Sequence, residues 1–406
     1  MSLNDYTNNN QNGKRILIIN VACGTGSTGR ICTDLAVAYE QQGFTVKIAY
    51  GRGTVPEWTR DWAVRIGNNV SVILDAMSSR IFDNAGFNSR FYTKQFLDWV
   101  NRYNPDIIHL HNLHGYYLNV ELLFNYLRNA GKKIIWTMHD VWAFTGHSAL
   151  CDGIDCRKWQ FGCGKCPQLR EYPIAWQDNS KNNWVKKRDI FSNIPNLTIV
   201  TPSNWLAQCV KKSFLQDYMV KVIPNGIDTT IFRPMKSGLR KRYGLECKFI
   251  ILGVASVWGK LKGLDDFVKL AKMLNDDYQV VLIGGNIASW QKKSIINIVH
   301  IDSQKELAEW YSVADVFVNL SYCDTYPTVN IEAVSCGTPV ITYETGGCAE
   351  AMHGYGGIVE KGNLYDLVDM LKELRKGNIK LDEIDACMEK DIFLQKYCEL
   401  IGGCNL

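Results

Sequence analysis

The stretch NLSYCDTYPTVNIEAVSCGTPVITYETGGCAE, residues 319–350, decides how this chain folds. The apolar run that leads into it, residues 313–320, predicts a buried strand, and a polar loop follows. A short helix is predicted from Val329 until Gly337 ends it, and residues 338–343 predict a second strand before a pair of glycines. Because strands that alternate with helices form parallel sheets, we expect the loops after these strands at the carboxyl edge, where ligands bind.

Two carboxylates and the glycine pair give this stretch a chemical character. Asp324 lies in the loop and Glu332 in the predicted helix, and a carboxylate can accept hydrogen bonds from the vicinal hydroxyls of a ribose or a sugar. The helix N-terminus beside Thr328 offers N–H groups to an anion, and Gly346-Gly347 lets the backbone approach a phosphate. Together they predict a pocket for a nucleotide-activated sugar. Taken singly, each residue is better explained by a structural role than by a role in the pocket: Asp324 as a loop cap and Glu332 as a solvated helix residue.

The spacing of these residues resembles the donor site of the retaining family-four glycosyltransferases. The pattern of that family is two acids separated by seven residues, then a Cys-Gly-Thr-Pro-Val strand and a Gly-Gly-x-x-Glu turn. This chain has Asp324 and Glu332, then residues 336–340, then a turn that ends at Glu350, with Asp where the family has its first Glu. The resemblance implies a GT-B fold, an α/β architecture of two Rossmann-like doubly wound domains that face each other across a cleft.

The composition is that of an ordinary globular protein. Its 406 residues, 46% hydrophobic and 21% charged, predict two or three domains. A net charge of +4 is too small to indicate nucleic acid binding, and no apolar run reaches the ~18–20 residues of a membrane helix. Residues 1–13 are rich in Asn and lack the apolar core of a signal peptide, so we expect a disordered leader. We therefore expect a cytoplasmic protein, with peripheral contact to the cytoplasmic membrane face as a further hypothesis.

A glycine-rich loop follows the first predicted strand, residues 14–21, and precedes a helix. Gly24, Gly26 and Gly29 match the Gly-x-Gly-x-x-Gly pattern of dinucleotide sites. Such a site needs an acid at the end of the second strand, where this chain has none, although Arg52 would suit the 2′-phosphate of NADP. By the family resemblance, we expect the loop to lie against the donor phosphates and the acceptor. A tight turn into a closely packed helix is the simpler alternative.

Histidines mark the ends of two further predicted strands. His109 and His111 end one strand, and His139 with Asp140 ends the next, so all four are expected at the carboxyl edge. Imidazole can bond a sugar hydroxyl or meet developing charge near neutral pH. The resemblance implies that the His-x-His end faces the transferred sugar, with His139 and Asp140 orienting acceptor or donor. A satisfied polar group under a loop would explain at least one of these histidines equally well.

Four cysteines lie close together: Cys151, Cys156, Cys163 and Cys166. The Cys-x-x-Cys ending, with glycine and proline beside it, is typical of a zinc site, and His147 could replace one ligand. We predict a structural zinc, because four thiolates leave no open position for catalysis. Disulfides are the alternative.

Aromatic and basic residues mix in a predicted helical region that contains Trp176, Trp184, residues 186–188 and residues 211–212. This mixture suits the surface of an anionic membrane or a lipid-diphosphate acceptor. A solvated helix face is the commoner outcome for such a run, so the membrane stays the second interpretation.

The second half restarts the strand and helix pattern and adds two lysines. Residues 220–228, which include Asn225, resemble the family segment that crosses between the domains beside the cleft. Lys260 and Lys262 follow the strand predicted at residues 249–255, where a lysine binds phosphate as a point charge. Lys262 matches the Lys-Gly of the family. The Arg expected a few residues earlier is absent, and Lys260 would take its place.

We therefore predict three segments after the leader. An amino-terminal acceptor-side domain spans residues 14–222 with a Cys-rich insertion at 147–170, and a donor domain spans 223–390. A helix at residues 391–406 would pack back on the first domain.

The resemblance implies a retaining hexosyltransferase that moves a sugar from a nucleoside-diphosphate sugar to a hydroxyl of a glycan or lipid-linked acceptor, in capsule or exopolysaccharide synthesis. Lys262 would stabilise the leaving phosphate without a catalytic metal, Glu332 would hold the ribose, and Asp324 with a histidine would hold the sugar. No carboxylate pair like that of a glycosidase is expected, so the leaving phosphate would take the acceptor proton on the same face. The alternatives are a sugar-nucleotide epimerase of the same fold, an NADP-dependent oxidoreductase that uses residues 24–29, and a non-catalytic sugar-nucleotide binding module.

Overall fold

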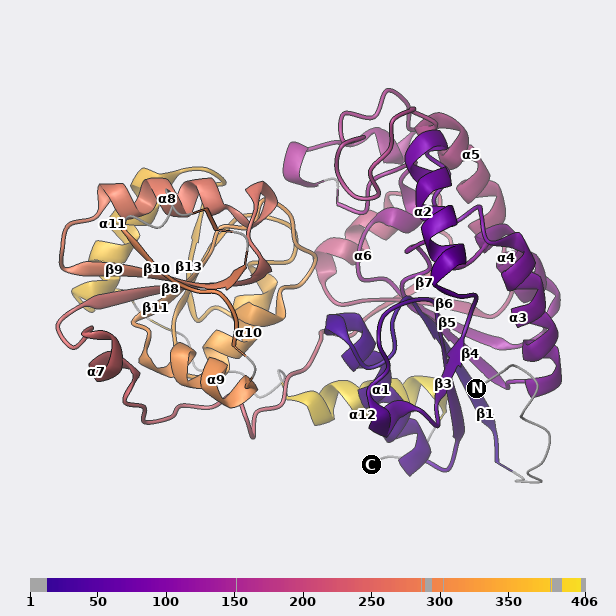
Figure 1. Ribbon diagram of the computed structural model, residues 1–406, viewed down its shortest axis with the longest axis horizontal. Helices are drawn as coiled ribbons and strands as arrows, with labels where there is room; N and C mark the ends of the chain where they lie inside the picture. The colour runs from indigo at the N-terminus through magenta and orange to yellow at the C-terminus, as the bar shows by residue number, and fades with distance from the viewer. Residues whose placement is uncertain are drawn as a thin grey trace.

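The protein folds into two α/β domains, each built on a parallel sheet (Figure 1). The computed structural model describes residues 13–150, 152–285, 287–288, 294–301, 303–379, 381 and 389–402. Cys151 and all of the expected leader except Gly13 lie outside the described residues, as do residues 403–406 of the expected last segment. The α/β class predicted from the sequence is confirmed.

The first sheet has the strand order β3-β2-β1-β4-β5-β6-β7 in the described residues, with every pairing parallel. Its strands are β1 (Arg15–Asn20), β2 (Thr45–Tyr50), β3 (Ala63–Arg65), β4 (Ile107–Leu110), β5 (Lys133–Thr137), β6 (Leu197–Thr201) and β7 (Met219–Val222). Its helices are α1 (Gly26–Gln41), α2 (Asn69–Phe82), α3 (Arg90–Tyr103), α4 (Val120–Asn129), α5 (Ser180–Phe191) and α6 (Asn204–Lys211). The order reverses between β1 and β4, and ligand sites of doubly wound sheets form at such switch points.

The second sheet has the order β10-β9-β8-β11-β12-β13 in the described residues, again with every pairing parallel. Its strands are β8 (Phe249–Val257), β9 (Tyr278–Gly285), β10 (Ile295–Ile298), β11 (Val316–Asn319), β12 (Val340–Tyr343) and β13 (Gly356–Val359). Its helices are α7 (Leu239–Tyr243), α8 (Leu264–Met273), α9 (Gln304–Val313), α10 (Thr328–Ser335) and α11 (Leu364–Arg375). The switch point lies between β8 and β11, which are the strands that precede the predicted lysines and carboxylates.

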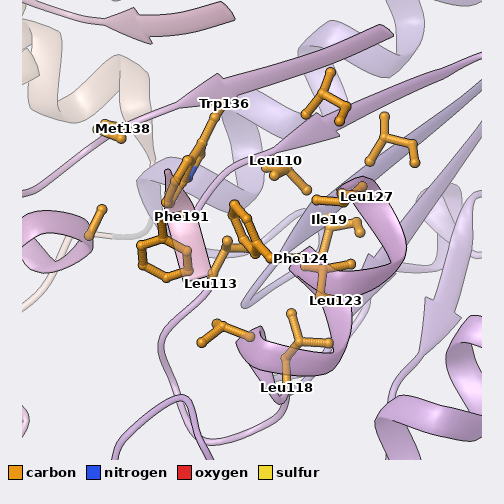
Figure 2. Close-up of a cluster of buried hydrophobic side chains, with 14 of the residues drawn as sticks. Ile19, Leu110, Leu113, Leu118, Leu123, Phe124, Leu127, Trp136, Met138 and Phe191 are labelled. Carbon is orange, nitrogen blue, oxygen red and sulfur yellow. The ribbon is translucent and has the colours of Figure 1, made fainter. Parts of the chain in front are cut away.

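A cluster of large apolar side chains fills the space between the first sheet and helices α4 and α5 (Figure 2). The rings of Phe124 and Phe191 have centroids 4.4 Å apart, and Trp136 of β5 lies 5.1 Å from Phe191. Trp136 also donates a hydrogen bond from Nε1 to the backbone carbonyl of His111 at 3.3 Å. The core therefore fixes the carboxyl end of β4, where the predicted histidines lie.

The chain crosses between the domains twice, and the two crossings lie side by side. Ile227 forms a parallel bridge with Glu389, and the backbone N–H of Lys390 donates to the carbonyl of Ile227 at 2.9 Å. Asn225, in the first crossing, is buried. Because the crossings are hydrogen-bonded to each other, they form one joint between the domains.

The last helix, α12 (Lys390–Ile401), contributes to the core of the first domain. Phe393, Tyr397 and Ile401 are buried with apolar residues of β1, β2 and α1. In Figure 1, α12 in yellow lies beside α1 in indigo. The hydroxyl of Tyr397 also lies 2.9 Å from Oγ1 of Thr137, so α12 reaches the carboxyl end of β5.

Two residues of the predicted aromatic and basic run are buried. Trp184 donates from Nε1 to the carbonyl of Trp159 at 2.9 Å. Nζ of Lys187 donates to the carbonyls of Trp142 at 2.8 Å and Thr145 at 3.1 Å, and burial lowers the pKa of Lys187 to about 7. Neither side chain is therefore part of an exposed basic face. None of the described helices has the length and apolar character needed to cross a bilayer.

Candidate functional site

The loops after β8 and β11 meet at the carboxyl edge of the second sheet. The backbone N–H of Tyr322 donates to the carbonyl of Leu261 at 2.9 Å, which joins the two loops. Nζ of Lys262, in the short 3₁₀ helix η5 (Lys260–Lys262), lies 2.7 Å from Oδ2 of Asp324. The topology therefore brings together two of the predicted site residues from separate loops.

The Lys262–Asp324 pair is partly shielded from water, with side chains 41% and 19% exposed. Burial alone would lower the pKa of Lys262, but the Asp324 carboxylate outweighs burial and raises it. The ammonium group is therefore charged at neutral pH and held in place by one carboxylate. Lys260, at the start of the same turn, is exposed.

The glycine pair packs directly against the loop after β11 that contains Asp324 and Thr325, which we call the carboxylate loop. A Cβ atom on Gly346, where φ is +53°, would collide with the carbonyl oxygen of Asp324, and one on Gly347 would collide with that of Thr325. The N–H of Gly347 donates to the carbonyl of Asp324 at 3.1 Å. The glycines therefore let two loops touch and fix the backbone of Asp324. The predicted contact of this turn with a phosphate stays a prediction, with the N–H of Gly347 already bonded.

Glu332 lies on α10, and groups from both domains act on its carboxylate. The hydroxyl of Tyr311 donates to its Oε2 at 2.9 Å. Burial raises the pKa of Glu332, while the hydrogen bond from Tyr311 and the charge of Arg30 on α1 partly offset this. Thr328 is the first residue of α10, and Pro327 before it provides no side-chain cap for the helix N-terminus.

His109 lies in the interior of the first domain. Its Nε2 is 2.8 Å from Oγ1 of Thr137 and its Nδ1 is 3.2 Å from the hydroxyl of Tyr39. The side chain has no exposed surface, and burial lowers the pKa of His109 to about 3, so the ring is neutral. Its hydrogen bonds tie β4 to β5 and α1. This position suits a structural role, and the predicted contact with a sugar stays a prediction.

His111 and His139 form a second pair nearer the surface. Nδ1 of His111 lies 3.0 Å from Nε2 of His139, and the rings are stacked with centroids 5.3 Å apart. Burial lowers the pKa of His139 to about 4 and that of His111 well below its usual range. His111 is buried, and its Nε2 has no hydrogen-bond partner among the described residues. His139 is partly exposed, which makes it the best placed of the three to meet a ligand.

Asp140 is paired with His114, a histidine without a predicted role. Nε2 of His114 lies 2.6 Å from Oδ2 of Asp140, and its Nδ1 lies 3.1 Å from the hydroxyl of Tyr172. Burial alone would raise the pKa of Asp140, but His114 outweighs burial and lowers it. His114 comes three residues after His111, so its place near the sheet edge could have been inferred. Tyr172 could not, because no local pattern relates it to this edge.

The predicted site residues of the two domains are linked by a direct hydrogen bond between the domains. Oγ1 of Thr325 donates to the backbone carbonyl of His139 at 2.7 Å. Thr325 follows Asp324 in the second domain, and His139 lies just beyond β5 in the first. The carboxylate loop and the histidine end of the first sheet therefore lie on opposite sides of one interface.

The glycine-rich loop after β1 is a tight turn at the switch point of the first sheet. The N–H of Gly24 donates to the carbonyl of Gly29 at 3.1 Å, and a Cβ atom on Gly24 would lie 2.9 Å from Cδ of Pro56. A Cβ atom on Gly26, the first residue of α1, would meet nothing within 4 Å. Close packing therefore explains Gly24, and open space lies beside Gly26.

The described part of the Cys-rich insertion does not by itself form a metal site. Cys156, Cys163 and Cys166 are free thiols, and no three His, Cys, Asp or Glu side chains of the described residues are grouped to hold a metal. Burial raises the pKa of Cys163, and it raises that of Cys166 to about 11. The predicted zinc site therefore depends on Cys151, which lies outside the described residues.

Two family models match this chain, one in each domain. Residues 28–231 match the family model described as Glycosyltransferase Family 4, and residues 248–376 match the one described as Glycosyl transferases group 1. The chain is 24% identical over 372 residues to a protein of Escherichia coli strain K12 named putative colanic acid biosynthesis glycosyl transferase WcaC. That alignment covers 88% of this chain and 90% of the relative.

Two solved structures have the same fold. Sucrose-phosphate synthase from Thermosynechococcus elongatus superposes with a TM-score of 0.69 at 17% identity, covering 96% of this chain and 98% of that one. HepE from Anabaena, solved in complex with UDP, gives a TM-score of 0.66 at 13% identity, covering 96% and 100%. The GT-B fold predicted from the sequence is confirmed.

The buried histidines predict that the protein loses stability in mild acid. A histidine whose pKa falls from 6.5 in the unfolded chain to about 3 in the fold binds its proton only when unfolded. The resulting loss of folding free energy is absent well above pH 6.5 and grows as the pH falls from 6.5 toward 3. In His109→Gln, we expect the free energy of unfolding to fall by about 1.4 kcal/mol less between pH 7.5 and pH 5.5 than in the wild type, measured by urea denaturation.

Equal slopes for His109→Gln and the wild type would contradict a neutral, buried His109.

Proposed function

The chain belongs to glycosyltransferase family 4, and we propose that it transfers a sugar from a nucleoside-diphosphate sugar to a hydroxyl group of a glycan or lipid-linked acceptor, with retention of the anomeric configuration. The observation that carries this proposal is the Lys262–Asp324 pair at the switch point of the second sheet, next to Thr325, which bonds the backbone of His139 across the domain interface. HepE, a protein of the same fold, was solved with UDP bound. WcaC, the E. coli relative, is named for colanic acid biosynthesis, and we extend polysaccharide assembly to this chain.

Lys262 would act on the leaving diphosphate. Before the donor binds, the Asp324 carboxylate forms an ion pair with Lys262 at 2.7 Å and keeps its charged ammonium group in position. A diphosphate that enters would compete for this ammonium group, and the lysine would stabilise the negative charge that develops as the glycosidic bond breaks. Because the positive charge is already oriented, little reorganisation is needed during the reaction.

Glu332 would hold the ribose of the donor. Its Oε2 accepts from Tyr311, and its Oε1 has no hydrogen-bond partner among the described residues. A sugar hydroxyl could therefore donate to Oε1 without breaking an existing bond. The raised pKa of this buried carboxyl group means that a donor hydroxyl would also relieve part of its desolvation.

His139 would face the transferred sugar. It is partly exposed, its backbone is bonded to the carboxylate loop, and its lowered pKa keeps the ring neutral at pH 7. A neutral imidazole can bond a hydroxyl without repelling an oxocarbenium-like centre. Because we expect no pair of catalytic carboxylates like that of a glycosidase, the leaving phosphate would take the acceptor proton on the same face of the sugar.

The donor site predicts a specific nucleotide response. A nucleoside diphosphate at about 100 times its dissociation constant should stabilise the protein by about 2.7 kcal/mol. Thermal melts with UDP, GDP, ADP, CDP, NADP and NADPH should show which nucleotide raises the melting temperature. Glu332→Ala should abolish the shift.

Lys262→Ala should lower transfer by on the order of 10²–10³ in kcat. Lys272→Ala, at an exposed position on α8, is the matched control and should leave both measurements unchanged.

A melting shift with NADP or NADPH alone would overturn the transferase proposal in favour of an oxidoreductase. Interconversion of the sugar nucleotide without an acceptor would indicate an epimerase. Binding without any turnover of a panel of sugar nucleotides and acceptors would indicate a binding module. NMR of the product's anomeric centre tests retention.

We also propose that α2 rests on an anionic membrane surface, where a lipid-linked acceptor would be found. Four apolar residues at helical spacing are each more than half exposed on this helix: Val70, Ile73, Leu74 and Met77. The acidic residue of the helix, Asp75, is buried, and Arg80 is its exposed charge. Trp176, 63% exposed, lies beside the helix and donates from its backbone N–H to the carbonyl of Arg80 at 2.7 Å. Apolar, aromatic and basic groups on one face suit a lipid headgroup region.

Co-sedimentation with vesicles tests this membrane contact. The protein should bind vesicles that contain anionic lipid. Leu74→Glu should weaken binding by about tenfold or more, because moving an exposed Leu side chain from water into the lipid contributes roughly 1.5–3 kcal/mol to binding. Met273→Glu, on the second domain, is the matched control. Equal binding by the two variants, or no binding to anionic vesicles, would contradict the proposal.

We retain the structural zinc as a proposal that depends on Cys151. Purified protein should then carry about one zinc per chain by elemental analysis, and Cys166→Ser should lose it. Cys247→Ser, at an exposed thiol, is the control. Protein free of zinc whose melting temperature is unaffected by a chelator would contradict it.

A further inference from the structure

Glu350, the acid that ends the Gly-Gly-x-x-Glu turn, reaches from the second domain to the N-terminus of α6 in the first. Its Oε2 accepts from the backbone N–H of Asn204 at 2.7 Å and from Nδ2 of Asn204 at 3.0 Å. Its Oε1 accepts from the backbone N–H of Trp205 at 2.7 Å. One carboxylate therefore receives three hydrogen bonds across the domain interface.

These bonds meet a chemical need of α6. The first N–H groups of a helix have no partners within the helix, and its N-terminus carries partial positive charge. The Ser203 side chain accepts from the N–H of Leu206 at 3.2 Å, which leaves the N–H groups of Asn204 and Trp205 for Glu350. The cap of this first-domain helix is thus completed by the second domain.

The turn that carries Glu350 is also bound to the carboxylate loop. The N–H of Gly347 donates to the carbonyl of Asp324, and a Cβ atom on Gly347 would lie 3.0 Å from Cβ of Ser203, just before α6. The same loop continues to Thr325, which bonds the backbone of His139. Glu350, the glycine turn and Asp324 therefore form one contiguous unit that is held against the first domain at two points, α6 and the end of β5.

The joint between the domains lies elsewhere, at the paired crossings of Ile227 and Glu389. In Figure 1, α12, which begins at this joint, lies below α6. Opening about the joint would separate the α6 contact, because Glu350 and Asn204 belong to different domains and are 146 residues apart in the chain. Opened, both the carboxylate and the helix N–H groups would bond to water.

We propose that Glu350 is a positioning residue that latches the two domains in the closed arrangement, so that Asp324 and Lys262 face His139 during sugar transfer. The effect on turnover rests on the proposed transferase function, whereas the effect on domain closure does not. Glu350 acts through the loop it holds and touches neither donor nor acceptor.

The latch predicts a loss of turnover without a loss of nucleotide affinity. In Glu350→Ala, kcat should fall by about tenfold or more, since hydrogen bonds to a charged group are lost, while the dissociation constant of the nucleoside diphosphate stays within about twofold. Glu350→Gln, which keeps the size of the side chain and one acceptor oxygen, should fall between the wild type and Glu350→Ala. Asn204→Ala removes one bond of three and should have the smallest effect.

Small-angle X-ray scattering supplies a readout independent of catalysis. Without ligand, Glu350→Ala should have a larger radius of gyration than the wild type, and saturating nucleotide with acceptor should reduce the difference. Glu344→Ala, an exposed acid just before the same glycine turn, is the matched control and should keep the wild-type radius of gyration and kcat.

Three results would overturn the latch. Nucleotide affinity that falls in parallel with kcat would make Glu350 a donor ligand. An unchanged radius of gyration together with an unchanged kcat would leave the contact without consequence. A lower melting temperature with wild-type kcat in Glu350→Gln and Asn204→Ala would limit its role to capping α6. If the protein transfers no sugar but Glu350→Ala still expands, the proposed function fails and the latch stands.

Discussion

Every strand pairing in the two sheets is parallel, and this constraint decides where the chemistry can lie. A parallel sheet has one carboxyl edge, and loops that leave it at a switch point diverge and open a crevice. Lys262 and Asp324 leave adjacent strands at the switch point of the second sheet, and His139 leaves the carboxyl end of β5 in the first. The site is therefore a meeting of two sheet edges, held together by the bond from Thr325 to His139.

Burial disfavours the charged form on both halves of this site, but the two halves end with different charges. His109, His111 and His139 pack against one another, and His109 also bonds Tyr39 and Thr137; burial lowers the pKa of these three rings and keeps them neutral. Lys262 is also shielded, but the neighbouring Asp324 outweighs burial and keeps it charged. The result is a neutral, hydrogen-bonding face opposite a charged one. Such a division suits a sugar on one side and a diphosphate on the other.

The same apolar core that stabilises the first domain also orients its side of the site. Trp136 packs on Phe191 and bonds the carbonyl of His111, while Tyr397 of α12 bonds Thr137 beside His109. The last helix of the chain therefore supports a strand end that it follows by more than 250 residues. In the second domain, the loop of Asp324 is held by the close contact of the glycines with the backbone of Asp324 and Thr325, and by the contacts of Tyr322 and Lys262 described above. The interdomain contacts of Thr325 and Glu350 then hold this loop against the first domain.

The sequence by itself determined the α/β class and the gathering of residues 319–350 at one sheet edge, because strand and helix periodicity and glycine positions are local properties. The GT-B fold followed from the resemblance of its motifs to those of the family-four glycosyltransferases. The sequence did not determine which side chains meet. His109 and His111 look alike in sequence, yet one has both ring nitrogens bonded inside the fold and the other pairs with His139. Trp184 and Lys187 look like surface residues and are buried. Partner choice, burial and the capping of α6 by Glu350 depend on residues distant in the chain. Only tertiary packing, which sets the distances between them and their access to water, decided these features.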